Sequence, residues 1–555
     1  MERSDGDSGD AMKSDTTDLI GTIDERLDGK LVWAIVCALL IVHVILAWQA
    51  REIGLVSAQD DGRYMLLARS LRDFSYRDIY LVGLPFHSVY PPGFPVALAV
   101  WGVIFGESFH GFVLMNVGMS ALALTIAFLA IRRGWSTTGA LLCLAVMSIN
   151  PHMVQRPGGV RSETLYIALS FVTLWALAPR KPNTRMLWVA AAAAVAAALT
   201  RSVGLSLVAA IGILWLMQRR YRPLAVFGVA AGVTVGAWMV WSAVAPDQVV
   251  GYNYFADVLD QSGALGLVAA LGQRVADMLP NYAGLTLPWV LGVPTIPGTP
   301  VDNAVISAVT LLAMLAGMVT LFRRWPIAII YMLLYGVLLV VWPYHRPRFM
   351  EPLIPVMLAT SLLGISVIVG RFRAHWALPA MALATALLVF GGIRRTTDLV
   401  EFRASCGPLS LAEPPACMQA DRASLLRTLD YIDRNTPDDA VFVTAKPEAL
   451  FFYTNRQSVL LQATFVGEWE SYVGDLRRKG VDYVILGSLH ADELVRLAPR
   501  LEPLCSELEV EAFFPPRTYL LRLGNSESPG ESDACQALED HRKANVNRRF
   551  TEDRA

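Results

Sequence analysis

Charged residues are scarce in this sequence. They make up 17% of its 555 residues, whereas hydrophobic residues make up 54%. This balance excludes an ordinary soluble globular protein and predicts a polytopic α-helical protein embedded in membrane lipid. The formal net charge of −1 is uninformative by itself, but no part of the chain forms a basic domain, so we expect no nucleic-acid partner.

Several catalytic and targeting motifs are also missing. The sequence contains no Walker phosphate-binding motif, no H-E-x-x-H pair and no Cys/His zinc spacing, which argues against an ATP-driven pump and a zinc protease. The polar N-terminus lacks the basic start and the small-residue cleavage site of a signal peptide. We therefore expect residues 1–30 to form a disordered cytoplasmic tail before a retained first helix.

Long apolar runs organise the chain between residues 31 and 393, and a helix needs about 20 such residues to cross a bilayer. Eleven runs of roughly spanning length lie near 31–49, 111–131, 136–150, 163–179, 186–200, 203–217, 224–245, 303–321, 327–342, 352–369 and 376–392. The run 93–106 is also apolar and is ambiguous by length alone.

Basic residues between the runs resolve this ambiguity, because Lys and Arg clusters mark the cytoplasmic side. All five clusters face the cytoplasm only if the N-terminus is inside and 93–106 does not cross. The clusters are Arg132 with Arg133, Arg180 with Lys181, Arg219 with Arg220, Arg323 with Arg324, and Arg371 with Arg373. We therefore predict about 11 transmembrane helices in the cell (inner) membrane and a juxtamembrane or re-entrant helix over 93–106.

This topology places the remaining polar segments outside the cell membrane. The external segments are the loops 50–110, 150–162, 246–302 and 343–351 and everything after about 393. Residues 394–524 read as a small extracytoplasmic α/β domain, followed by a polar, disordered tail over 525–555. Within the domain we expect a helix over 425–434 and strands over 441–443, 481–486 and 518–523.

Four of the six cysteines lie in this C-terminal part. An even number in an oxidising compartment fits two disulfides, which proximity along the chain assigns to Cys406 with Cys417 and Cys505 with Cys535. Four free thiols in a cytosolic domain are the alternative, and the cysteine count alone does not decide between them.

The first external loop carries two adjacent carboxylates, Asp60 and Asp61. One hypothesis makes them a general base and its supporting carboxylate, because a like charge and apolar surroundings raise a carboxyl pKa. The alternative is helix N-capping, since Asp is favoured directly before a helix. The loop then reaches Tyr90-Pro91-Pro92-Gly93-Phe94-Pro95, which cannot lie inside a helix because each proline lacks an N–H donor.

Arginines recur at the outer ends of the apolar runs, where they predict a lipid-phosphate site or simple interfacial anchoring. They are Arg161, Arg201, Arg346 and Arg348. Glu163 begins the run after the second external loop and is either an acid facing Asp60 or a helix N-terminal acid. His87 and Tyr90 are further candidates for contact with an acceptor or a metal, with interfacial anchoring as the alternative.

These motifs resemble the glycosyltransferase C superfamily, in particular its protein O-mannosyltransferase and aminoarabinose-transferase branch. The likeness lies in the acidic pair after the first run, the Tyr-Pro-Pro-Gly-Phe-Pro segment, Arg161-Ser162-Glu163, Thr200-Arg201 and the stretch from Arg348 to Pro355. It covers about 31–370, and residues 31–393 are the expected catalytic membrane domain.

The resemblance implies transfer of a sugar, with inversion, from a polyprenyl-phosphate carrier to the hydroxyl of an extracytoplasmic protein, lipid or glycan in a bacterial cell envelope. Asp60 matches the base that deprotonates the acceptor. Asp61 matches a position that is commonly Glu. Arg201 and Arg348 match residues that hold the carrier phosphate. Some relatives need a divalent metal and others do not, so the resemblance leaves metal use open.

Two other function classes compete with this reading. A secondary transporter or lipid flippase is expected to carry charges near the bilayer midplane, in broken helices and repeated halves. Here the charges cluster at one face and no repeated half is visible. A non-catalytic subunit of polysaccharide assembly, with the C-terminal domain as its working part, is the third hypothesis.

Overall fold

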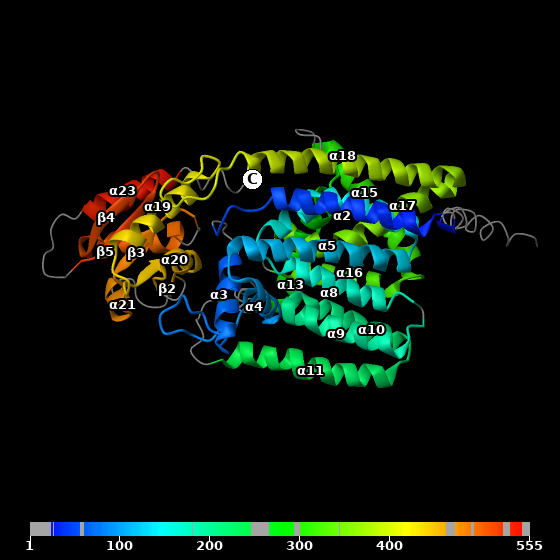
Figure 1. Ribbon diagram of the computed structural model, residues 1–555, viewed down its shortest axis with the longest axis horizontal. Helices are drawn as coiled ribbons and strands as arrows, with labels where there is room; N and C mark the ends of the chain where they lie inside the picture. Colours follow the sequence, from blue (N-terminus) through cyan, green and yellow to red (C-terminus); the bar gives the residue numbers. More distant parts are fainter. Residues whose placement is uncertain are drawn as a thin grey trace, which may run out of the picture.

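The computed structural model contains a bundle of long helices and a smaller region built around a β-sheet, which lies beyond one end of the bundle (Figure 1). The structure describes residues 24–546 apart from 26, 56–59, 180, 246–265, 294–299, 343–344, 462–471, 490–492 and 525–532. Most of the expected N-terminal tail therefore lies outside the described residues.

Each of the eleven apolar runs forms a helix, and most of these helices lie side by side (Figure 1). They are α2 (Gly29–Gln49), α5 (Phe109–Gly134), α6 (Thr137–Ile149), α8 (Glu163–Ala176), α9 (Thr184–Thr200), α10 (Leu205–Met217), α11 (Tyr221–Val244), α15 (Pro300–Phe322), α16 (Pro326–Val341), α17 (Ile354–Phe372) and α18 (Ala377–Ala404). Between α11 and α15 the chain also forms α13 (Gly266–Pro280) and α14 (Leu287–Leu291).

Six helices in the described part of the chain are long and apolar enough to cross a membrane, or seven if α6 and residues 151–158 form one bent span. The helices α8, α9, α10 and α16 are shorter, at 13–17 residues. At about 1.5 Å per residue they extend roughly 20–26 Å, less than the ~30 Å hydrocarbon core. The helices support a membrane protein, and the count of eleven crossings stays a prediction.

The ambiguous run 93–106 forms the 13-residue helix α4 (Gly93–Phe105). It packs against α3 (Asp61–Arg72), the helix of the loop 50–110, at the end of the bundle nearest the sheet (Figure 1). Gly93 sits so close to α9 that an added Cβ would lie 2.7 Å from the carbonyl oxygen of Leu199. The Pro-Pro-Gly-Phe-Pro segment therefore begins a helix that packs closely against α3 and α9.

The described residues after α18, which we call the sheet region, contain five strands in the order β2-β1-β3-β5-β4. The first three pair in parallel, and β5 and β4 are antiparallel. Its elements are α19 (Ala420–Asn435), β1 (Phe442–Thr444), α20 (Pro447–Thr454), β2 (Ser458–Leu460), α21 (Tyr472–Arg478), β3 (Tyr483–Leu486), α22 (Ala498–Leu501), β4 (Leu508–Phe514), β5 (Thr518–Leu523) and α23 (Asp533–Val546). The expected helix and three strands are present, and β2 and β4 are additions.

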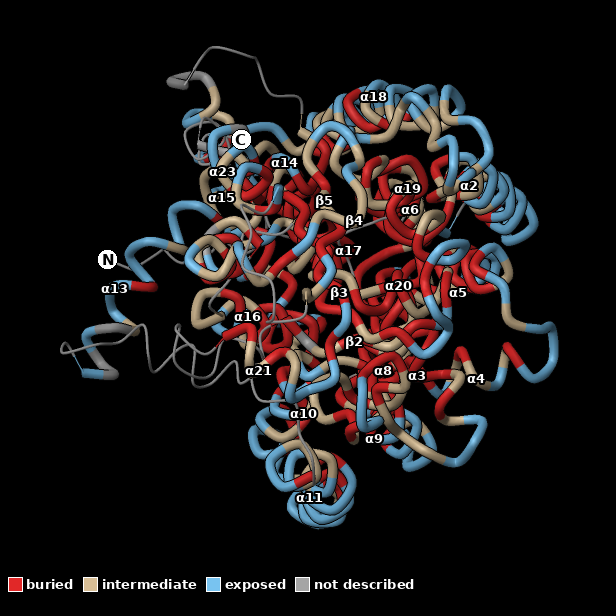
Figure 2. The backbone as a smooth tube through the Cα atoms, turned by 90° about the vertical axis from the view of Figure 1, so that its left-hand side faces the viewer, coloured by how far each residue is buried: buried red, intermediate tan, exposed pale blue. Residues whose placement is uncertain are grey.

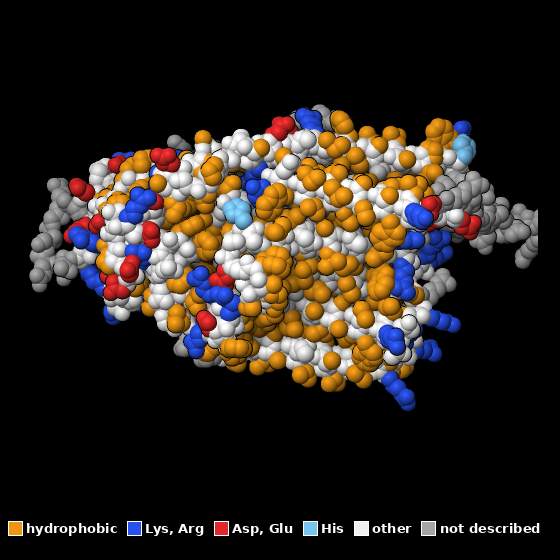
Figure 3. Space-filling view, in the orientation of Figure 1, with side chains coloured by type: hydrophobic (Ala, Val, Ile, Leu, Met, Phe, Trp, Pro, Cys, Tyr) orange, Lys and Arg blue, Asp and Glu red, His pale blue; other side chains and the backbone are white. Residues whose placement is uncertain are grey.

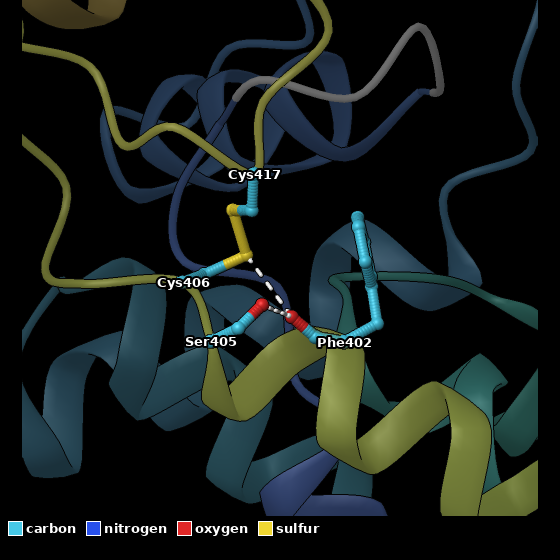
Figure 4. The surroundings of a disulfide bond; sticks show 4 residues. All are labelled: Phe402, Ser405, Cys406 and Cys417. Atoms are coloured by element: carbon cyan, nitrogen blue, oxygen red, sulfur yellow. Dashed lines mark hydrogen bonds between the residues drawn. A yellow bond between two sulfur atoms is a disulfide. The ribbon is translucent and has the colours of Figure 1, made fainter.

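The prediction of a disordered tail after residue 524 is wrong for α23. Its Ala534 and Leu538 are buried in the apolar core of the sheet region, and a disulfide joins its Cys535 to Cys505. Cys406 and Cys417 form the second disulfide, in the connection between α18 and α19 (Figure 4). Both expected pairings are therefore confirmed.

On the face seen in Figure 3, the helical bundle is mostly apolar along its length; a group of Lys and Arg side chains lies at the end remote from the sheet region, and others lie near the sheet region. Helix α11 stands at the margin of the bundle and is mostly exposed (Figure 2). Its exposed side chains include Val229, Val233 and Val240. Large apolar side chains on an outer helix face are expected where lipid, rather than water, surrounds the protein.

Candidate active site

Asp60 is the residue directly before α3, at the end of the bundle that faces the sheet region. Its side chain makes no N-capping hydrogen bond. Instead, Tyr90 donates its hydroxyl to Oδ1 of Asp60 at 3.0 Å, and Nη2 of Arg348 lies 3.9 Å from Oδ2. The Asp60 and Arg348 side chains are 37% and 30% exposed, so both groups are open to a ligand.

Arg348 is distant from Asp60 in the sequence and lies in the 3-10 helix Pro347–Leu353 that leads into α17. Glu351 of the same 3-10 helix is fully buried and accepts a 2.5 Å hydrogen bond from Nε of Arg156. His152 also approaches Glu351, at 3.4 Å. These contacts anchor the Arg348 segment to the loop 150–162. Sequence reasoning placed no role on Glu351 or Arg156, although Glu351 lies within the motif that carries the resemblance.

A second polar group lies around Arg201, in an extended conformation at the end of α9. Its Nη1 donates to Oγ of Ser162 at 2.8 Å and lies 3.0 Å from Oε1 of Glu163. Ser162 also shares a 3.1 Å hydrogen bond with the Tyr64 hydroxyl of α3. The Tyr64 ring is 5.1 Å from the Tyr90 ring, so two tyrosines connect the Arg201 group with Asp60.

Asp61 lies in a different environment from its neighbour, because its side chain is only 3% exposed. Nε of Arg161 is 3.6 Å from Oδ1, and the Val160 amide donates to Oδ2 at 3.4 Å. Arg161 also pairs with the buried carboxylate of Glu52. Burial, reinforced by the carboxylates of Glu52 and Asp60, raises the pKa of Asp61 above its usual range despite Arg161. Two carboxylates thus share one guanidinium inside the protein.

The contacts of Arg161 in this cluster do not fit the role that we expected for it, which was to bind phosphate. Its side chain is 5% exposed and engaged with Glu52 and Asp61. Contact with a lipid phosphate would require the breaking of buried ion pairs, which is costly. Arg346 is exposed at the start of the 3-10 helix, two residues before Arg348.

His87 is likewise buried rather than open to an acceptor or a metal. Its Nδ1 lies 2.8 Å from Oδ1 of Asp78, and its Nε2 accepts the backbone N–H of Tyr90 at 2.8 Å. The His87 and Tyr90 rings also stack, with centroids 5.4 Å apart. His87 therefore holds Tyr90 in place, and Tyr90 itself contacts Asp60. Within the described residues, no three His, Cys, Asp or Glu side chains are grouped to hold a metal ion.

Comparison with solved structures finds the same fold. The chain aligns with ArnT from Cupriavidus metallidurans bound to undecaprenyl phosphate, with 16% identity and a TM-score of 0.52 over 91% of this chain and 100% of ArnT. It also aligns with the oligosaccharyltransferase AglB from Archaeoglobus fulgidus in complex with an inhibitory peptide and a dolichol-phosphate, with 13% identity and a TM-score of 0.53. That alignment covers 91% of this chain and 77% of AglB.

The fold that the resemblance implied is therefore confirmed. No protein-family model and no curated protein matches the sequence. The identities of 13–16% carry the fold alone, and the chemistry of this chain has to be inferred from its own side chains.

Proposed function

We propose that this protein is a membrane glycosyltransferase that moves a sugar from a polyprenyl-phosphate carrier to the hydroxyl of an acceptor. The observation that carries this proposal is the half-open Asp60 carboxylate, which accepts the Tyr90 hydroxyl and faces Arg348. A carboxylate beside a guanidinium, at the end of a membrane helix bundle, offers a base and an anion-binding group together. The lipid phosphates bound to ArnT and AglB support the same class of donor.

Asp60 is the proposed general base. Its carboxylate takes the proton from the acceptor hydroxyl as the acceptor oxygen forms a bond to the anomeric carbon. The bond between that carbon and the phosphate oxygen breaks, and its electron pair stays on the carrier phosphate. Attack opposite the leaving group inverts the anomeric centre. The hydrogen bond from Tyr90 to Oδ1 fixes the orientation of the Asp60 carboxylate, and Oδ2 faces Arg348.

Arg348 and Arg201 are the proposed ligands of the phosphate. The leaving group is already anionic, so it needs charge stabilisation rather than a strong general acid. Arg201 is 21% exposed and is oriented by Ser162 and Glu163, which assigns Glu163 to the positioning of an arginine. We place Arg346 at the rim of the site and assign Arg161 to the buried support of Asp61.

We propose that the sheet region and the Asp60 face lie outside a bacterial cell membrane, with the N-terminus inside and about 11 crossings. Two disulfides in the C-terminal part support an oxidising compartment. The gathering of Lys and Arg at the opposite end of the bundle supports the same orientation, because positive charge marks the cytoplasmic side. Acceptors in that compartment are proteins, lipids or glycans.

The test is transfer by the purified protein in liposomes that contain a panel of polyprenyl-phosphate sugars. We expect Arg348→Gln to raise the KM for the donor roughly tenfold to a hundredfold, since it removes a charge-assisted hydrogen bond to phosphate. Arg373→Gln, after the opposite end of α17, is the matched control and leaves the KM unchanged. An unchanged donor KM in Arg348→Gln contradicts the phosphate assignment.

One observation favours a transporter or lipid flippase as the second candidate. Helix α6 and residues 151–158 are bent by 58° at Asn150, and broken helices line the sites of many transporters. The same liposomes separate the two functions. Movement of lipid or solute across the bilayer without any sugar transfer supports the transporter, whereas a glycosylated product supports the enzyme.

A further inference from the structure

The sheet region is hydrogen-bonded to the first external loop, and the contact continues its β-sheet. The Ser458 amide, at the start of edge strand β2, donates to the Tyr80 carbonyl at 3.0 Å. The Val82 amide donates to the Ser458 carbonyl, also at 3.0 Å. The loop thus pairs in parallel with the free side of an edge strand, which is a specific way to join two parts of a protein.

A buried ion pair joins the same two parts through their helices. Oε1 of Glu448, in α20, accepts hydrogen bonds from Nε and Nη2 of Arg63, in α3, at 2.8 and 2.5 Å. The two side chains are 10% and 12% exposed. The helices meet at Gly62, where an added Cβ would lie 3.0 Å from Cβ of Glu448. Removing one partner of such a pair leaves a charge buried.

Arg63 connects this ion pair with the proposed base. Its Nη1 donates to the Tyr90 hydroxyl oxygen at 3.4 Å, and its guanidinium carbon lies 5.5 Å from the Tyr90 ring centre. Because the Tyr90 oxygen receives a hydrogen from a cation, its own hydrogen is directed to Asp60 at 3.0 Å. One continuous series of contacts therefore leads from Glu448 through Arg63 and Tyr90 to Asp60.

We propose that Glu448 is a positioning residue of the active site, which orients Asp60 through Arg63 and Tyr90. This inference rests on the proposed function, in which Asp60 is the base. The sheet region then completes the catalytic centre instead of being an attached module. When Glu448 loses its charge, Arg63 loses the carboxylate that accepts two of its hydrogen bonds, and Asp60 is another anion within the same hydrogen-bond network.

A double-mutant cycle of Glu448→Gln and Tyr90→Phe tests this coupling. We expect Glu448→Gln alone to lower kcat by about tenfold with little change in the donor KM, and to have less than about a twofold effect in the Tyr90→Phe background. Glu448→Asp, which keeps the charge, restores part of kcat. Glu507→Gln is the matched control, because Glu507 pairs with Arg477 inside the sheet region. Equal losses in both backgrounds overturn the proposal.

Hydrogen–deuterium exchange of the full-length protein gives a readout that does not depend on sugar transfer. We expect the amides of residues 78–90 to exchange faster in Glu448→Gln and at the wild-type rate in Glu507→Gln. Wild-type exchange in Glu448→Gln overturns the coupling. Faster exchange in a protein that transfers no sugar from any donor refutes the proposed function but retains the link between the sheet region and the loop.

Discussion

Asp60 and Asp61 are consecutive carboxylates with opposite environments. The Asp60 side chain is 37% exposed and bonded to Tyr90, whereas the Asp61 side chain is 3% exposed beside Arg161. Consecutive residues at the start of a helix point in different directions, so one carboxylate faces the site and the other faces the packed interior. Only Asp60 is placed to meet a substrate.

Asp61 gives a pH-dependent prediction. Burial raises its pKa in the folded state, while an unfolded chain keeps a carboxyl pKa of about 4. The folded state then binds an extra proton, so this contribution to stability is full below about pH 4 and is lost as the pH rises through the raised pKa. We expect the Tm of Asp61→Asn minus that of the wild type to increase over this interval, measured by scanning fluorimetry in detergent. A constant or decreasing difference contradicts the assignment.

At the residue scale, local sequence context draws attention to exposed polar groups more than to buried ones. Asp60, Arg201 and Arg348 stand beside apolar runs and proline motifs that mark them. The pairs Arg63–Glu448 and Arg156–Glu351 join residues 385 and 195 positions apart. These ion pairs form only when the whole chain has folded, so no spacing in the sequence predicts them. The buried state of Arg161 was missed for the same reason.

At the scale of elements, small residues allow a close contact between two helices of the bundle. Helices α15 and α17 meet at Gly317 and Gly364. A Cβ on Gly317 would lie 1.8 Å from the Thr360 carbonyl oxygen, and a Cβ on Gly364 would lie 1.7 Å from that of Ala313. Each glycine lies four residues after a small residue of its own helix, a spacing that lets membrane helices approach closely.

We expect Gly364→Ala to destabilise the protein by about 1–3 kcal/mol, because the added methyl group forces the two backbones apart. The measurement is the midpoint of thermal unfolding in detergent. Gly336→Ala, in α16, is the control, since an added Cβ there meets nothing within 4 Å. A wild-type midpoint in Gly364→Ala would show that the two helices separate without cost, contrary to the observed packing.

The apolar runs predicted the helices of the bundle because burial in lipid imposes a long, uniform signal on the sequence. The sheet region gives weaker signals. Strand β2 has three residues, too few for a period, and α23 is rich in charged residues, which resembles a solvated tail. Helix α23 is fixed to the sheet region by a disulfide and by a few small and apolar side chains, Ala534 and Leu538 among them.

At the scale of the whole molecule, the disulfides provide a test of orientation. After mild reduction of intact cells, we expect a membrane-impermeant maleimide to label the cysteines of the sheet region, for example Cys505 and Cys535, without permeabilisation. A variant with these two cysteines replaced by serine controls for other thiols. Labelling that requires permeabilised cells places the sheet region in the cytoplasm and refutes the proposed topology.

The most direct test of the central claim is the initial rate of sugar transfer by Asp60→Asn in liposomes, compared with the wild type and with Asp73→Asn. Asp73 is exposed at the far end of the same helix and serves as the matched carboxylate. Loss of a general base lowers the rate by about 10²–10⁴-fold, so we predict that drop for Asp60→Asn and none for Asp73→Asn. Full transfer by Asp60→Asn would contradict the account.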